Sequence, residues 1–97
     1  MFAIAVTSQV QLDKIEKASS IFQDSVIPAY RQLRGFKSAT LLIDPATGKS
    51  LGISLWESEA DRAAVQSSGA LQQQLGKFAS VLAAPPAPNF YEVMAQM

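Results

Sequence analysis

Aromatic side chains are the residues of this chain that could do chemistry, because two common catalytic residue types are missing. The sequence contains no histidine and no cysteine. Their absence excludes the commonest general base, thiol nucleophiles, disulfides and the usual metal and haem ligands. The candidates that remain for catalysis are Trp56, Tyr30 and Tyr91. An indole can stack on a planar ligand, and a phenol can donate a proton or bind a substrate oxygen. Each of the three could also be an ordinary core or interface residue.

A second group of residues could bind a substrate without reacting with it: Trp56, Ser54, Phe22 and Arg34. Ser54 could satisfy a polar group of a ligand, or instead pair with Thr40 across a hairpin. Arg34 could steer an anionic ligand, or instead complement a helix dipole. The chain has no nucleophilic triad, phosphate-binding glycine loop, paired-carboxylate motif or metal-ligand cluster. Any catalysis must therefore come from a pocket that orients a reactive substrate and excludes water.

Length and charge limit the class of protein. The 97 residues fit one domain, residues 1–97, and 48% hydrophobic against 16% charged residues is typical of a folded chain. Eight Lys and Arg balance eight Asp and Glu, so the basic excess of a nucleic-acid-binding protein is missing. No targeting signal and no apolar stretch of the roughly 20 residues needed to span a membrane is present. We therefore expect a soluble, cytoplasmic protein that does not bind membranes.

The positions of apolar and turn-forming residues predict the elements that must place these side chains. Short apolar runs predict strands, and apolar residues spaced by three or four predict helices. The predicted order is a strand at Phe2–Thr7, a helix at Leu12–Leu33, strands at Phe36–Ile43 and Lys49–Glu57, a helix at Ser58–Leu82 and a strand at Asn89–Met97. This order is the ferredoxin-like β-α-β-β-α-β arrangement of an α+β protein, a four-stranded antiparallel sheet with two helices on one face.

Proline and glycine residues predict where these elements bend or end. Pro28 should kink the first helix, and Gly35 is a plausible end cap. The segment 44–48, Asp-Pro-Ala-Thr-Gly, has the composition of a hairpin turn. Gly69 should bend or split the second helix. The segment 83–88 contains three prolines, which predicts a stiff, extended connector before the last strand.

Both faces of the predicted sheet carry apolar residues. In the strand Phe36–Ile43, Leu41 and Ile43 share one side, and Phe36 and Leu42 share the other. Because two helices can cover only one face, several large side chains would stay exposed, which would forfeit ~5–10 kcal/mol. Packing of a second copy, sheet against sheet, would recover this energy. The pattern predicts a homodimer with two-fold symmetry, and the alternative is a monomer with an exposed apolar sheet.

Several segments resemble a known family. They are Gly35-Phe36 at the start of a strand, Leu41-Leu42-Ile43-Asp44, the turn that ends in Thr47-Gly48-Lys49, the run Ile53-Ser54-Leu55-Trp56-Glu57-Ser58-Glu59-Ala60-Asp61, and the closing Phe90-Tyr91-Glu92-Val93. With the order of elements, they resemble the antibiotic biosynthesis monooxygenase (ABM) family. Proteins of this family are dimeric α/β-barrels, so the resemblance implies that fold and a homodimer.

The resemblance also implies a function. It is the cofactor-free oxygenation of a small aromatic or polyketide-like compound, with neither metal nor flavin, in a pocket between the helices and the sheet. Trp56 matches the tryptophan of the family. The asparagine of the family has no match, because the only asparagine of the chain is Asn89. The haem-degrading members require a histidine, which this chain lacks. Two alternatives therefore stay open: a non-catalytic dimer that binds a small hydrophobic ligand or acts as an accessory module, and a regulatory ligand-sensing domain.

Overall fold

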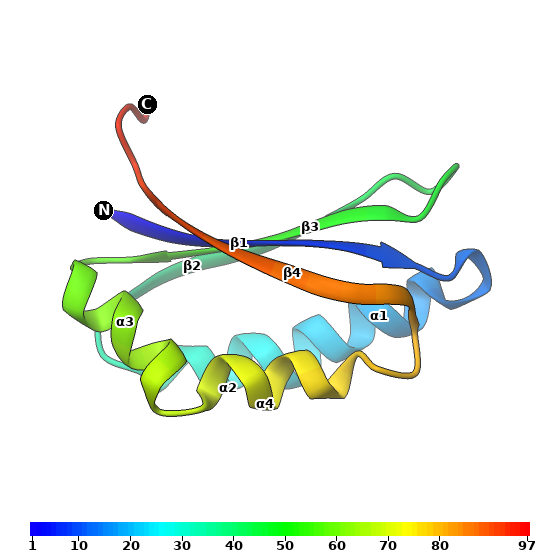
Figure 1. The fold of residues 1–97 in the computed structure, drawn as a ribbon, viewed down its shortest axis with the longest axis horizontal. Helices are drawn as coiled ribbons and strands as arrows, with labels where there is room; N and C mark the ends of the chain where they lie inside the picture. The colour runs from blue at the N-terminus through cyan, green and yellow to red at the C-terminus, as the bar shows by residue number, and fades with distance from the viewer.

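The computed structural model describes residues 1–97 and contains one antiparallel sheet of four strands in the order β2–β3–β1–β4. The strands are β1 (Phe2–Val10), β2 (Phe36–Ile43), β3 (Lys49–Trp56) and β4 (Leu82–Glu92). All the helices lie on one face of this sheet (Figure 1). The predicted ferredoxin-like α+β fold is therefore confirmed. No helix has the length and apolar composition that crossing a membrane requires.

The first helical segment runs between β1 and β2 and changes its winding along its length. Its parts are η1 (Leu12–Lys14), α1 (Ile15–Ile21), the π-helical η2 (Phe22–Val26) and α2 (Ile27–Arg31). Pro28 lies in the first turn of α2. Because proline has no N–H group, it cannot continue the hydrogen-bond ladder of an α-helix, and the wide π turn immediately precedes it. The predicted distortion at Pro28 is present, and the helix ends earlier than predicted.

The second helical segment is split in two. Its halves are α3 (Glu59–Ser67) and α4 (Ala70–Lys77). The Ser58 hydroxyl accepts a hydrogen bond of 3.0 Å from the backbone N–H of Asp61, which caps α3. Gly69 separates the halves with a φ of 85°, a left-handed conformation that glycine adopts without steric cost. The split predicted at Gly69 is present, although α4 ends earlier than predicted.

The hairpin between β2 and β3 forms as predicted. The Asp44 carboxylate accepts a hydrogen bond of 3.0 Å from the backbone N–H of Ala46, as is typical of an aspartate that opens a turn. Gly48 closes the turn with a φ of 80°, and a Cβ atom there would lie 2.1 Å from the carbonyl oxygen of Val10. Only glycine fits this position.

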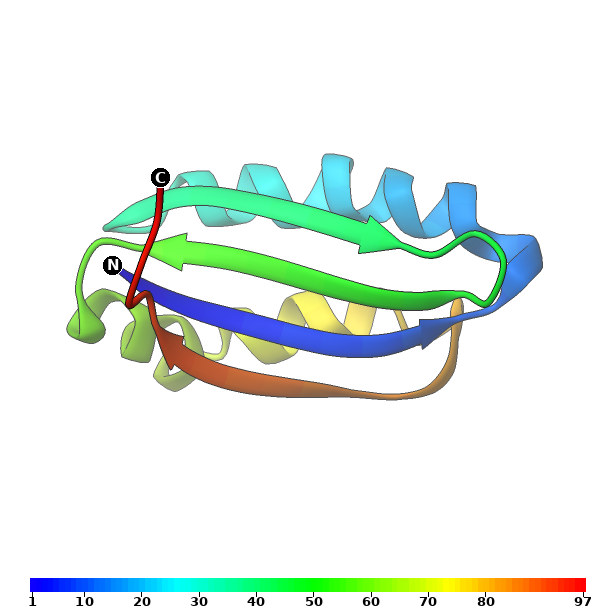
Figure 2. The ribbon, with the colours of Figure 1, turned by 90° about the horizontal axis from the view of Figure 1, so that it is seen from above.

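The prediction for the end of the chain is wrong in its bounds. The proline-rich segment 83–88 is not a connector but part of β4, which begins at Leu82 and ends at Glu92. Residues 93–97 lie outside the strand. The prolines are accommodated because β4 is an edge strand that pairs only with β1 (Figure 2). The β1–β4 register also shifts between Thr7 and Val10, next to the first two prolines.

The main core lies between the helices and the sheet. It contains seven buried residues: Ile4, Phe22, Val26, Tyr30, Trp56, Val65 and Leu71. Phe36 packs against this core, with its ring centroid 5.5 Å from that of Trp56. The sequence pattern had placed Phe36 on the other face of β2, together with Leu42. A register shift between Phe36 and Ser38 changes the alternation and turns this ring toward the helices.

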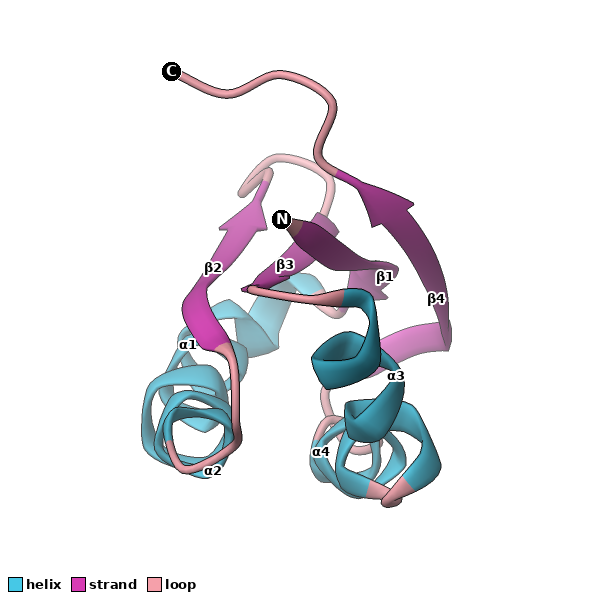
Figure 3. Ribbon diagram, turned by 90° about the vertical axis from the view of Figure 1, so that its left-hand side faces the viewer, coloured by secondary structure: helices cyan, strands magenta, loops and turns pink.

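No helix covers the opposite face of the sheet (Figure 3). Alternation from Trp56 places Leu51, Ile53 and Leu55 of β3 on this face, which we call the open face. Two other large side chains there are exposed, Leu42 at 51% and Tyr91 at 55%. The open face is therefore apolar, as the strand pattern predicts.

Candidate functional site

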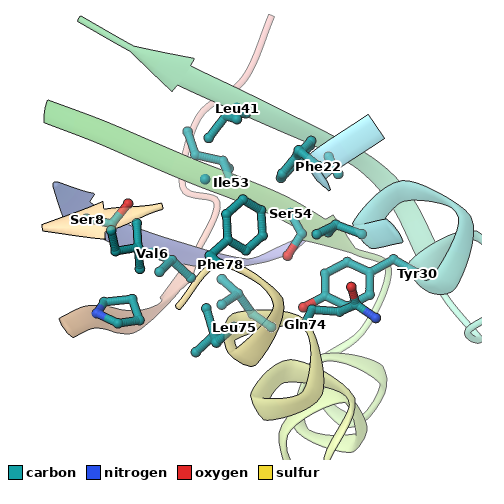
Figure 4. Close-up of a pocket in the computed structure, with 16 residues that line it drawn as sticks. Val6, Ser8, Phe22, Tyr30, Leu41, Ile53, Ser54, Gln74, Leu75 and Phe78 are labelled. Atoms are coloured by element: carbon teal, nitrogen blue, oxygen red, sulfur yellow. The ribbon is translucent and has the colours of Figure 1, made fainter. Parts of the chain in front are cut away.

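A cavity of about 70 Å³ lies between the helices and the sheet. Sixteen residues line it, and 11 of these are hydrophobic. They come from all four strands, from the first helical segment and from α4 (Figure 4). No lining residue carries a charge. The cavity is therefore an apolar pocket with a few neutral polar groups, which is the common composition of a small-molecule site.

A glycine leaves the floor of this pocket open. Gly52 pairs with Val6 of β1 and Leu41 of β2, so it lies in the middle of the sheet. A Cβ atom at Gly52 would face the pocket, and its nearest neighbour would be Cε2 of Phe22 at 3.9 Å. This distance is an ordinary van der Waals contact. A side chain at this position would therefore occupy pocket volume without a clash.

Tyr30 projects from α2 toward the pocket, and two aromatic rings hold its own ring in place. Its ring centroid lies 5.4 Å from that of Trp56 and 6.5 Å from that of Phe36, both in edge-on geometry. Burial raises the pKa of Tyr30 from 10.0 to about 12 because the charged phenolate is poorly solvated there. At neutral pH the hydroxyl is therefore protonated and can act as a hydrogen-bond donor, but not as a base.

Two more polar side chains in the pocket are each fixed by one hydrogen bond. The indole Nε1 of Trp56 donates to Oγ of Ser54 over 3.0 Å. The hydroxyl of Ser25 in η2 donates to Oε1 of Gln74 in α4 over 2.8 Å. The second bond links the two helical segments across the pocket. The predicted alternative in which Ser54 pairs with Thr40 is not found, because Ser54 is opposite Ala39 and Thr40 is opposite Ile53, on the other face of the sheet.

The structure brings only some of the candidate residues together. Tyr30, Ser54 and Phe22 all line the pocket. Trp56 is fully buried behind the pocket and contacts two of its lining residues, Ser54 and Tyr30. Tyr91 lies on the open face of the sheet, away from the pocket, because it pairs with Ala3 on the side opposite Ile4.

Arg34 also lies away from the pocket. Its side chain is 95% exposed, and its Nε lies 3.7 Å from the carboxylate of Asp61. An exposed pair at this distance contributes little energy. Arg34 is therefore a surface residue near the end of the first helical segment, and it is not positioned to contact a ligand in the pocket.

Sequence reasoning missed two residues of the site, Gln74 and Gly52. A signal for Gln74 was present, because it interrupts the apolar stripe of α4 between Leu71 and Phe78. Gln74 is only 7% exposed, and a buried polar residue on an apolar stripe is unusual. Gly52 gave no such signal, since a glycine inside a strand has several common explanations.

The fold of this chain matches several solved structures. No protein-family model matches the chain, and no curated protein matches its sequence. Solved structures do match. A monooxygenase from Streptomyces coelicolor, ActVA-Orf6 in complex with nanaomycin D, shares 24% identity at a TM-score of 0.73, over 99% of this chain and 89% of that one. A Nitrosomonas europaea protein provisionally named an antibiotic biosynthesis monooxygenase shares 18% identity at a TM-score of 0.75. The match covers 98% of this chain and 100% of that one.

The chain has the fold of the antibiotic biosynthesis monooxygenases. The ABM fold is shared as well with SnoaB, a cofactor-independent oxygenase from Streptomyces nogalater. The SnoaB structure, of the N63A mutant, has 11% identity and a TM-score of 0.75, over 99% of this chain and 95% of that one. The predicted resemblance to the ABM proteins is thus confirmed at the level of the fold. At these identities the likeness extends to architecture, and the chemistry of the site must be argued from its own residues.

Within this ABM fold, the residues of the pocket limit what it can do. No carboxylate or lysine lines it, and Tyr30 is protonated at neutral pH. The structure brings together no group of three or more acidic side chains that could hold a metal ion. The pocket can bind the apolar body of a ligand and donate hydrogen bonds to its polar groups. It offers no side chain that would remove a proton from the ligand.

Proposed function

We propose that this protein is a cofactor-free monooxygenase that oxidises a small aromatic or polyketide-like compound. The observation that carries the proposal is the apolar, uncharged pocket between helices and sheet, with Tyr30 in its wall. The fold supports it, because proteins of the same architecture include a monooxygenase bound to nanaomycin D and a cofactor-independent oxygenase.

The proposed chemistry balances without a cofactor. An activated methylene group of the substrate loses a proton to water, because no lining side chain can accept it, and the resulting carbanion supplies electrons to dioxygen. The proton is returned when the hydroperoxide formed on that carbon loses water. One oxygen atom enters the product as a ketone, and the other leaves as water: R₂CH₂ + O₂ → R₂C=O + H₂O. The protein contributes orientation and hydrogen bonds to the oxygen that gains negative charge. Tyr30 is suited to the last role because its proton is retained at neutral pH.

The size of the cavity limits the substrate. Its volume of about 70 Å³ is well below the roughly 300–1,000 Å³ of typical ligand sites. A substrate with several fused rings can enter only if side chains move. Phe22 on η2 and Phe78 after α4 border the cavity and are the groups that would have to swing aside. A π turn such as η2 is frequent at functional sites.

Oxygen consumption tests the proposal. Anthrone, a phenol tautomer with an activated methylene group, is added to the protein in an oxygen electrode, and its spontaneous oxidation is subtracted. We expect uptake of one O₂ per ketone formed. Trp56→Phe should slow turnover, because Ser54 then loses the donor that orients it, while circular dichroism shows an intact fold. An unchanged rate in Trp56→Phe would remove Trp56 from the reaction.

A second candidate function is non-catalytic binding of a small hydrophobic ligand by the same pocket. The observation that favours it is the absence of an ionisable base among the lining residues. In this case the protein would bind aromatic compounds tightly and consume no oxygen with any of them. The same electrode experiment, combined with a binding titration, therefore separates the two functions.

We further propose that two copies pair through their open faces, with two-fold symmetry, and that the protein acts in the cytoplasm. Support for the pair comes from the exposed Leu42 and Tyr91 and from the apolar row of β3 between them. Burying this surface against water yields about 25 cal/mol per Å² of apolar area. A paired arrangement would leave both pockets free, because each lies on the helical side of its sheet.

A further inference from the structure

We propose that the pocket selects neutral aryl ketones, by means of a subsite of three hydrogen-bond donors formed by Tyr30, Ser54 and Gln74. This inference rests on the proposed function in one respect, namely that the pocket binds a small molecule. It goes beyond that function because it states which polar group the ligand carries, where that group lies, and which charge the ligand must not have.

Each of the three side chains is more than nine-tenths buried, with exposures of 5%, 6% and 7% for Tyr30, Ser54 and Gln74. Polar groups at such depth normally have partners. No fully buried side-chain nitrogen or oxygen of the protein lacks one. Donor groups without a protein partner therefore keep some accessible surface, and the three side chains that carry them line the cavity.

The hydrogen bonds within the protein leave a free proton on each of the three. Ser54 accepts from Trp56, so its own hydroxyl proton is available. Gln74 accepts at Oε1 from Ser25, so both protons of its Nε2 are available. Tyr30 makes no hydrogen bond with another protein group, and its hydroxyl keeps its proton at neutral pH. A ligand oxygen that accepts hydrogen bonds can pair with these protons, whereas a ligand donor would leave the Gln74 amide unpaired.

The three donors lie at one end of the pocket. Ser54 is opposite Ile4 on β1, while Ser8, the other hydroxyl that lines the pocket, is opposite Ser50. Four residues of strand separate these two positions by about 13 Å at roughly 3.3 Å per residue. Figure 4 shows the polar ends of Tyr30, Ser54 and Gln74 together, and Val6 and Ser8 on the other side of the Phe78 ring. The ligand oxygen would lie at the first end, and its apolar body would extend toward the second.

The electrostatics exclude a fully charged ligand. None of the 16 lining residues is Lys or Arg, and Arg34 lies on the surface. Transfer of an unpaired carboxylate or phosphate into such a site costs much more than three neutral hydrogen bonds return. A ketone oxygen accepts hydrogen bonds without this penalty. The donors and the lack of positive charge together therefore favour a neutral carbonyl group.

Four compounds of similar size test the inference on the intact protein by ligand-detected NMR titration. The ketone 1-indanone only accepts hydrogen bonds, and indane neither accepts nor donates them. Indole donates a hydrogen bond, and benzoate carries a negative charge. None of the four needs to be oxidised for the measurement. We expect 1-indanone to bind about tenfold more tightly than indane, a ratio that one to two ordinary hydrogen bonds supply. Indole and benzoate should bind no more tightly than indane.

Single substitutions assign the preference to the three residues. Tyr30→Phe, Ser54→Ala and Gln74→Leu should each reduce the ratio of indanone to indane affinity by about fivefold or less, the effect of one neutral hydrogen bond. Their affinity for indane should stay near that of the unmodified protein, which reports that the pocket is intact. Tyr91→Phe is the matched control, because it removes the hydroxyl of the other tyrosine, on the open face, and should change neither affinity.

The possible outcomes are distinct. Equal binding of 1-indanone and indane would overturn the subsite while leaving a binding pocket. A preference for 1-indanone that is unchanged in each of the three single variants would also overturn it. Tighter binding of benzoate or indole would overturn the argument from charge or from donors. If none of the compounds binds, the pocket has no ligand-binding role and both proposals fall. An indanone preference without oxygen uptake from anthrone would support the subsite and refute only the oxygenation.

Discussion

Substitution of Gly52 by alanine should make the protein more stable and its pocket less able to bind a ligand. The backbone of Gly52 has no positive φ, and the added Cβ would have only Phe22 nearby, at 3.9 Å. Replacing a glycine in such a conformation stabilises a protein by about 0.4–1 kcal/mol through the unfolded state. The buried methyl group adds up to about 0.8 kcal/mol. We therefore expect Gly52→Ala to raise the free energy of unfolding by about 0.4–1.8 kcal/mol.

The same methyl group takes up part of a cavity of about 70 Å³, so affinity for an aromatic ligand should fall. Urea unfolding followed by the fluorescence of Trp56, the only tryptophan, measures the first effect, and titration with indane measures the second. Gly76→Ala is the matched control, because Gly76 in α4 has free space around it and does not line the pocket. It should stabilise the helix by about 0.5–1 kcal/mol without changing affinity. A destabilised Gly52→Ala variant, or one with unchanged affinity, would refute the reasoning.

Three further predictions follow from the structure. Burial raises the pKa of Tyr30 above its unfolded value, to about 12. The contribution of Tyr30 to stability should therefore be complete below pH 10 and decrease as the pH rises from 10 to 12. Chemical denaturation at several pH values should show this decrease for the unmodified protein and not for Tyr30→Phe. Ser58→Ala removes the cap of α3 and should lower the free energy of unfolding by about 1 kcal/mol in the same assay. Leu42→Lys places a charge on the open face, at a side chain that is 51% exposed and does not line the pocket. It should convert the proposed pair into a folded particle of 10.4 kDa by light scattering, whereas an unmodified protein that is already monomeric would contradict the pairing.

Local chemistry made much of the fold predictable. The turn at Asp44 and the break at Gly69 depend on residues close together in the chain, and both are present. The last strand was misjudged because proline was taken to exclude pairing. Its place at the sheet edge, where a missing N–H group costs little, depends on the strand order and cannot be inferred from the segment itself.

The site was less predictable, since it depends on which side chains meet across elements. Phe22, Tyr30 and Ser54 were chosen for their chemical types, and they do line the pocket. Trp56 was a candidate either for contact with a ligand or for the core, and its complete burial places it in the core, behind the pocket. Gln74 acquires its role only through Ser25 on the other helical segment. A hydrogen bond over such a separation in sequence leaves no local pattern.

The three prolines of β4 also govern how copies of the chain can associate. Pro85, Pro86 and Pro88 lie in the outermost strand and present no amide hydrogens to a neighbour. An incoming strand would find no regular ladder there, so edge-to-edge addition is blocked at this side of the sheet. The prolines thus act against open-ended polymers, and they leave the apolar open face as the surface through which the proposed pair would form.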